Sequence, residues 1–273
     1  MTPENPYFGA TNKELDTKRL EIQSSGFNPY TEKFLEDLGL SKETALDLAT
    51  GTGAVLTILA KYANRITALD SDKDQLAEAQ KVIELFNLGS KVELRQGNAL
   101  ELDLPDNTFS IVHARLLLTN LPTKTHSQVV NESIRVLKPG GVLVLEELGV
   151  DRGWHAKPPS SHFETLVNAV IEARNRTEIS NQTGPELEDL VTISGLKTIA
   201  KNSYSIESRA KDPFTQLNVM FMTLYTPLLV RTGALSKEES EVHLEGLKND
   251  IKDNPDMKVW APQMFQVAAK KLS

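Results

Sequence analysis

Between residues 41 and 150, short apolar runs alternate with longer segments in which apolar side chains recur every three or four positions. The short runs predict buried strands, and the longer segments predict helices that cover them. This alternation is typical of a mostly parallel sheet with helices on both faces. We expect strands at 45–49, 65–70, 91–96, 110–114 and 142–147, and helices at 54–63, 73–86 and 124–137.

The helix at 73–86 has the clearest pattern. Asp72 followed by Gln75 is typical of a helix start. The third helix, at 124–137, is expected to stop at Lys138-Pro139-Gly140-Gly141, where proline and paired glycines turn the chain into the next strand. The apolar positions expected on one face of the 73–86 helix are Leu76, Ala79, Ile83 and Phe86.

The flanking segments have a different texture. Residues 11–38 predict one or two helices, and residues 151–162 form a loop rich in Trp, His and Pro before a helix to about 177. Alternation at 196–207 predicts a sixth strand, and 264–269 a seventh, antiparallel at the edge. Residues 212–254 predict two inserted helices, with Pro227 bending or ending the first. These helices either cover a site or extend the core, and the sequence favours neither alternative.

The composition describes an ordinary globular protein, with 40% apolar and 25% charged residues and a formal net charge of −7. There is no basic stripe that would bind nucleic acid through its phosphates. With no cysteine, there is no disulfide framework or thiolate metal site. The first ten residues lack the pattern of a signal peptide, and every apolar run is shorter than a membrane span. We therefore expect a soluble, cytoplasmic protein.

A glycine-rich turn follows the first strand and is the sharpest chemical feature. Small residues at Ala49, Gly51 and Gly53 let the backbone turn sharply and approach a ligand. A nicotinamide fingerprint would need a third glycine where Leu56 stands, and no phosphate-binding lysine motif is present. The acid that precedes the glycines, Asp47, is better placed for a ligand with an ammonium or sulfonium charge than for a pyrophosphate.

Asp70 ends the second predicted strand, where a carboxylate can accept both hydroxyls of a ribose. Together with the turn it resembles the first two motifs of class I S-adenosylmethionine-dependent methyltransferases. Three further segments in the expected order strengthen the resemblance, which is closest to the small-molecule branch of the ubiquinone- and menaquinone-biosynthesis type and covers about residues 10–150. These segments are Gly97-Asn98-Ala99, Leu104 to Phe109 and Arg135 to Gly141.

The resemblance implies an α/β fold: a Rossmann-like, seven-stranded, mostly parallel sheet with an antiparallel edge strand, helices on both faces and a helical lid. It implies one domain over 1–273, with an N-terminal helical segment at 1–40, a cofactor-binding core at 41–150 and the substrate side at 151–273. The implied cofactor is S-adenosyl-L-methionine. The implied cofactor-binding residues are Asp47, Ala49, Thr50, Gly51, Gly53, Asp70, Ser71, Asn98, Ala99, Ala114 and Arg115.

The chain departs from the family pattern at three positions. Ala49 replaces the first glycine, Asn98 replaces an aspartate that reads the adenine amino group, and Ser110 replaces the aspartate after Phe109. Alanine is the mildest change available, and an amide oxygen can still accept from an amino group. The cofactor hypothesis therefore survives all three.

Methyl transfer from a sulfonium is an in-line displacement, so the protein needs alignment and, for some acceptors, a base. The candidate bases are His113, His155 and His162, although each is as readily a structural or exposed histidine. His126 and His243 are expected on solvated helix surfaces. Candidate substrate residues are Glu147, Trp154, Phe221 and Tyr225, and no cluster at metal-ligand spacing is present.

The leading hypothesis is methyl transfer to the oxygen, nitrogen or carbon of a small molecule with an apolar portion. One alternative is a protein of the same fold that binds S-adenosylmethionine without transferring its methyl group, or that runs another reaction. A nicotinamide-dependent oxidoreductase is a further alternative, and a nucleic-acid methyltransferase is disfavoured by charge. No membrane partner is expected, and homodimerisation is compatible with the sequence.

Overall fold

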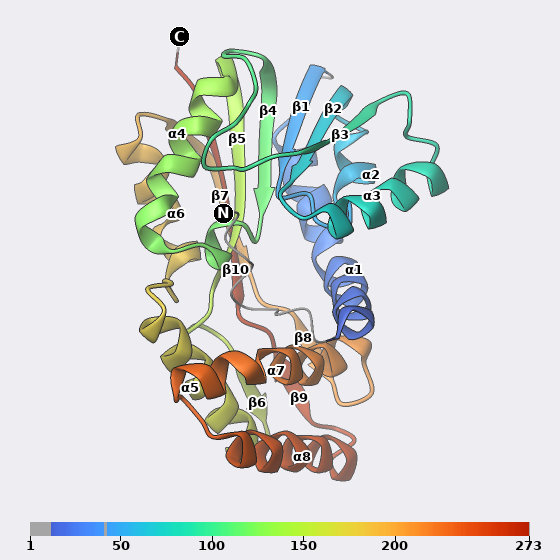
Figure 1. The fold of residues 1–273 in the computed structure, drawn as a ribbon, viewed down its shortest axis with the longest axis vertical. Coiled ribbons are helices and arrows are strands. Elements are labelled where there is room, and N and C mark those ends of the chain that lie inside the picture. Colours follow the sequence, from blue (N-terminus) through green and yellow to red (C-terminus); the bar gives the residue numbers. More distant parts are fainter. Residues whose placement is uncertain (1–11, 41–42, 273) are drawn as a thin grey trace.

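The computed structural model describes residues 12–40 and 43–272. A seven-stranded sheet of order β3-β2-β1-β4-β5-β10-β7 lies in the upper half of the molecule (Figure 1). Each strand predicted in residues 41–150 is present, with its bounds shifted by a few residues. The strands are β1 (Glu43–Leu48), β2 (Ala63–Asp70), β3 (Val92–Gln96), β4 (Phe109–Arg115), β5 (Leu137–Gly149), β7 (Lys197–Tyr204) and β10 (Gln263–Lys270).

The sheet is parallel from β3 through β5, and β10 is its one antiparallel strand among the described residues. We expected that strand at the edge of the sheet. It lies one place further in, hydrogen-bonded to β5 on one side and to β7 on the other. Its side chains are consistent with this interior place, because Met264, Ala268 and Ala269 are fully buried. The outermost strand, β7, alternates between exposed and half-buried positions.

Helices cover both faces of the sheet (Figure 1). On one face lie α4 (His126–Val136) and α6 (Thr183–Ile193), and on the other lie α1 (Lys13–Asp37), α2 (Leu56–Leu59) and α3 (Lys73–Leu85). The helix expected at 54–63 is only the single turn α2, because β2 already begins at Ala63. The α3 prediction holds except at its end, where Phe86 lies beyond the helix and is 54% exposed.

A helical lobe lies below the carboxyl ends of the parallel strands (Figure 1). It contains α5 (Ser161–Arg176), α7 (Pro213–Thr232) and α8 (Lys237–Asp253), packed around a core that includes Phe163 and Met222. The two inserted helices are thus present as expected. Pro227 does not end α7, which continues to Gly233, a glycine with φ +71° that terminates the helix.

Three short strands form a second, smaller sheet that the sequence did not predict. Its order is β6 (His155–Lys157), β9 (Lys258–Trp260) and β8 (Glu207–Arg209). The strand expected at 196–207 therefore ends at Tyr204, and the chain starts a new pairing at Glu207. In the parts of the chain that the structure describes, every helix is too short or too polar to cross a membrane.

Candidate functional site

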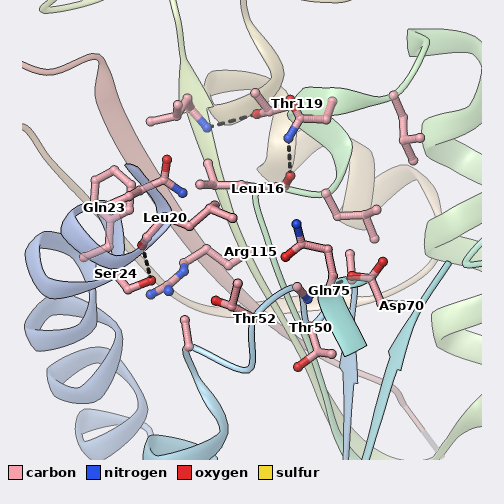
Figure 2. Close-up of a pocket in the computed structure, with 18 of the residues that line it drawn as sticks. Leu20, Gln23, Ser24, Thr50, Thr52, Asp70, Gln75, Arg115, Leu116 and Thr119 are labelled. Atoms are coloured by element: carbon pink, nitrogen blue, oxygen red, sulfur yellow. Dashed lines mark hydrogen bonds between the residues drawn. The ribbon is translucent and has the colours of Figure 1, made fainter. Parts of the chain in front are cut away.

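A cavity of about 850 Å³ lies where the carboxyl ends of the parallel strands meet the helical lobe. This volume lies within the range of about 300–1,000 Å³ that is common for ligand sites. Figure 2 shows Thr50, Asp70 and Gln75 on one side of the cavity and Ser24 of α1 on the other, with Arg115 between them. Segments far apart in the sequence thus build one site.

The turn after β1 forms one wall of the cavity. Ala49 and Gly51 have φ values of +53° and +54°, and Gly53 has φ +79°. A side chain on Gly53 would lie 3.2 Å from the Cα of Ala79, so glycine permits α3 to approach the turn. Gly53 therefore serves the packing of the turn and does not itself line the cavity.

Asp70 ends β2 and is bound to this turn. Its two carboxylate oxygens accept from the backbone N–H groups of Gly51, at 2.8 Å, and Asp72, at 2.9 Å. Burial raises the pKa of Asp70, and these two hydrogen bonds oppose that shift. Because a carboxylate offers about four acceptor positions, Asp70 can still accept from hydroxyl groups in the cavity.

Asn98 follows β3 at the same edge of the sheet. Its Oδ1 accepts from the backbone N–H of Leu100 at 3.0 Å, which fixes the direction of the amide. Ala99 and Leu100 also line the cavity. The second lone pair of Oδ1 stays available to a ligand amino group.

Three charged side chains on neighbouring strands form a buried cluster, which we call the Asp47–His113–Glu146 triad. His113 lies between Asp47, whose Oδ1 is 2.7 Å from Nδ1, and Glu146, whose Oε1 is 2.9 Å from Nε2. All three side chains are at least 97% buried. Since an ionised carboxylate can only accept, both ring nitrogens donate and His113 is the imidazolium cation.

The pKa shifts of His113 and Glu146 are consistent with this charge state. Burial by itself would lower the pKa of His113, but hydrogen bonds to Asp47 and Glu146 raise it to about 9. Burial would raise the pKa of Glu146, but the hydrogen bond and charge of His113 lower it. His113 is therefore not a base at neutral pH, because it already holds its proton and both nitrogens are occupied.

A hydrogen-bond network connects the triad to α1. Thr31 and Gln266 both donate to Oε2 of Glu146, at 2.9 and 2.7 Å. Arg115 donates from Nη1 to Thr31 and to Asn28, at 2.9 and 3.0 Å. The network fixes α1 against the sheet, so that α1 supplies part of the cavity wall.

The other two candidate bases lie away from the cavity. His155 is exposed on β6, where its ring stacks on Trp260 with centroids 4.5 Å apart. His162 packs between α5 and α8, and its Nδ1 is 3.2 Å from Nδ1 of His243. The small sheet and the α5–α8 contact direct these rings elsewhere, so neither can serve as the base that we expected. His126 and His243 were expected on solvated surfaces, but His126 is buried and donates to the Leu121 carbonyl oxygen.

Glu147 is also unavailable to a substrate. Its carboxylate accepts from the backbone N–H groups of Leu117, Leu118 and Thr119, at 2.8–3.0 Å, and is completely buried. Burial raises the pKa of Glu147 to about 7, against the opposing effect of those hydrogen bonds. Its role is to hold the segment after β4, and that segment lines the cavity.

Twelve of the predicted cofactor and substrate residues come together in the cavity wall, and their contact with ligands stays a prediction. Gly53, Ala114 and Glu147 do not line it, since Ala114 is buried within the sheet. The twelve are Asp47, Ala49, Thr50, Gly51, Asp70, Ser71, Asn98, Ala99, Arg115, Trp154, Phe221 and Tyr225.

Sequence reasoning missed several residues of the wall. Gln75 reaches the cavity from α3, Arg174 from α5 and Asn218 from α7, where Asn218 accepts from Trp154 Nε1 at 2.8 Å. The four-residue spacing of Phe221 and Tyr225 was visible in the sequence. No local signal distinguishes Arg174 from Arg176, the more exposed arginine of the same helix.

Comparisons with known proteins agree with this geometry. Residues 46–145 match the family model described as a methyltransferase domain. A demethylmenaquinone methyltransferase of Bacillus licheniformis is 35% identical over 139 residues, which are 50% of this chain and 58% of that protein. A similar match, 36% identical over 151 residues, is found with the same type of enzyme in Lactobacillus johnsonii. The chain thus spans somewhat over half the length of these curated relatives.

A solved structure extends the fold comparison to most of the chain. A methyltransferase-like protein of Bacillus halodurans superposes with a TM-score of 0.61 at 21% identity, covering 88% of this chain and 98% of that one. At this identity the likeness concerns the fold, and it includes the strands and helices outside residues 46–145.

Proposed function

We propose that this chain, whose residues 46–145 form a class I methyltransferase domain, transfers the methyl group of S-adenosyl-L-methionine to a small molecule with an apolar portion. The observation that carries the proposal is a set of buried oxygen atoms in the cavity wall. Oδ2 of Asp47, Oγ1 of Thr50 and Oε1 of Gln75 have no hydrogen-bond partner among the described residues. Buried acceptors of this kind are costly unless a ligand supplies donors.

The donors of S-adenosylmethionine fit these acceptors by chemical type. Its ammonium and sulfonium charges suit Asp47, whose Oδ1 is bound to His113 while Oδ2 has no donor in residues 12–40 and 43–272. Its ribose hydroxyls suit Asp70, and its adenine amino group suits Oδ1 of Asn98. Arg115 has donors beyond those used on α1, and these suit a carboxylate.

When bound, the cofactor supplies an electrophilic methyl group. The protein must then orient the acceptor and exclude water, which can supply much of the rate of a displacement. Trp154, Phe221 and Tyr225 provide an apolar surface for this purpose, with Trp154 and Phe221 edge to face and Phe221 stacked on Tyr225. With His113 protonated and the other two histidines remote, we infer that the acceptor atom needs no histidine base.

Calorimetric titration tests the cofactor assignment. We expect the purified protein to bind S-adenosylhomocysteine and to be silent toward NAD. Asp70→Ala removes acceptors for the ribose and for Gly51 N–H, and should weaken binding by roughly tenfold or more, as the loss of charged hydrogen bonds does. Asp74→Ala, which changes an exposed acid that does not line the cavity, is the matched control. Binding of NAD without binding of S-adenosylhomocysteine would reverse the assignment.

A further inference from the structure

The substrate side of the cavity contains a buried arginine, Arg174, with no acidic partner among the residues that the structure describes. Arg174 on α5 is only 3% exposed and lines the cavity. Its Nε donates to Oδ1 of Asn181, and its Nη2 donates to the carbonyl oxygens of Thr119 and Ser180. None of the described acidic residues forms an ion pair with it, and Nη1 has no described hydrogen-bond partner.

A guanidinium in this position is incompletely compensated. Removing a charged group from water is unfavourable unless an opposite charge or a full set of acceptors replaces the water. Three neutral oxygens compensate part of the cost and hold the side chain in one orientation. The buried acid Glu147 on β5 uses its carboxylate on the backbone of residues 117–119, the segment that Arg174 also contacts. An anion that enters the cavity would supply the missing opposite charge and a further hydrogen-bond acceptor for Arg174.

Apolar side chains of the acceptor side line the same cavity as Arg174. Val170 lies one turn earlier on α5 and also lines the cavity, so the two side chains share a helix face. Across from α5, the lining of α7 includes Phe221 and Tyr225. A low-polarity neighbourhood strengthens the attraction between Arg174 and an anion.

Charge is segregated along the cavity wall. Three of the acids in the wall, Asp47, Asp70 and Asp72, lie at β1, at the end of β2 and just after it, the side suited to a positively charged cofactor, and Asp16 on α1 pairs with Arg19. Arg174 comes instead from α5, in the helical lobe. The cofactor's own carboxylate has Arg115, which extends from the end of β4 beside the triad. The other buried cations of the wall, Arg19 and His113, have acidic partners. Arg174 has none among the described residues and therefore matches an anion of the acceptor.

We propose that Arg174 binds an anionic oxygen group, of the carboxylate kind, on the methyl acceptor, while the apolar body of the acceptor packs against Trp154, Phe221 and Tyr225. This inference rests on the proposed methyl transfer and adds the chemical class of the acceptor to it. Arg174 holds the anionic group as an anchor, and the atom that receives the methyl group lies elsewhere in the molecule. The segment 117–119, held by Glu147 on one side and by Arg174 on the other, keeps the anchor in place.

The test uses pairs of probes that differ only in charge: benzoate and benzamide, 1-naphthoate and 1-naphthamide, and decanoate and decanamide. Each is titrated calorimetrically into the full chain with and without saturating S-adenosylhomocysteine. We expect at least one carboxylate to bind roughly tenfold or more tightly than its amide, as a charge-assisted hydrogen bond provides. Arg174→Gln should abolish this preference and leave the affinity for S-adenosylhomocysteine unchanged.

Arg176→Gln is the matched control, because Arg176 lies on the same helix, is 44% exposed and pairs with Glu172. It should retain the preference for carboxylates. The inference is overturned if no wild-type pair favours the acid, if Arg174→Gln keeps the preference, or if Arg174→Gln loses S-adenosylhomocysteine, which would make the anion the cofactor's own. Should Arg174→Gln fail to fold, the test uses the titrations of the wild-type chain and of Arg174→Lys with the same acid and amide pairs. Arg174→Lys is expected to retain a reduced preference for the carboxylates. Failure of the wild-type chain to bind S-adenosylhomocysteine is a separate result that would sink the proposed function.

Discussion

Replacing His113 with glutamine should destabilise the protein and remove part of its pH dependence. The change deletes the one cation between two carboxylates that are almost completely buried, Asp47 and Glu146. Glutamine can donate from one amide group but carries no charge. Asp47 and Glu146 would then be two buried anions on strands either side of β4.

Two independent estimates give the loss of stability expected for His113→Gln. Removing one partner of a buried ion pair typically costs about 3–5 kcal/mol. The pKa of His113 is raised from 6.5 to about 9, and at about 1.4 kcal/mol per unit this corresponds to about 3 kcal/mol. For a chain of this size, 3 kcal/mol lowers the melting temperature by roughly 6–12 °C.

Urea denaturation across a pH series provides the assay. Because folding raises the pKa of His113, its contribution is complete below pH 6.5 and is lost as the pH rises through about 9. The wild-type free energy of unfolding should therefore fall across this window, and His113→Gln should lack that part of the slope. His155→Gln, which changes an exposed histidine outside the network, is the control. A variant as stable as the wild type, or one with the same slope, would refute the charged triad.

Two further changes test the backbone around the site. Gly53→Ala should lower stability by about 1–3 kcal/mol, because its Cβ would lie 3.2 Å from Ala79 at φ +79°. In the control, Gly195→Ala, the glycine has φ +87° and open space around it, so the change should cost only the strain of the backbone conformation. Equal losses of stability in chemical denaturation would contradict the packing argument. Glu147→Gln should reduce stability by about 1–3 kcal/mol, because one of its two acceptor oxygens becomes a donor facing the N–H groups of residues 117–119. Amide hydrogen exchange should then accelerate at Thr119 and not at β2, and unchanged exchange would exclude this role.

The parallel strands of residues 41–150 and the residues on the cofactor side of the cavity were predictable from the sequence. Both depend on local patterns, since alternating strand and helix periods place the carboxyl ends of parallel strands at one edge. The acids that end β1 and β2 therefore had to meet beside the glycine turn, and the cavity is lined by both Asp47 and Asp70.

The side chains of the helical lobe could not be placed in the same way. His155 and His162 were expected over the cavity because they follow β5 in the chain. Pairing with β9 and packing against α8 turned them away, and both partners lie about 80 or more residues further along the sequence. The same long-range packing brought Arg174 to the cavity wall.

The sequence by itself determined the parallel core, the glycine-rich turn and the acids at the ends of two strands, because these follow from short-range periodicity and from residue types at strand ends. Only the tertiary structure decided which polar groups are still available for chemistry. His113 and Glu147 lost that availability to partners on other strands and loops, and Arg174 gained it by being buried without an acid. The physical reason is that burial and hydrogen-bond satisfaction are properties of surroundings assembled from distant segments, and no local pattern encodes them.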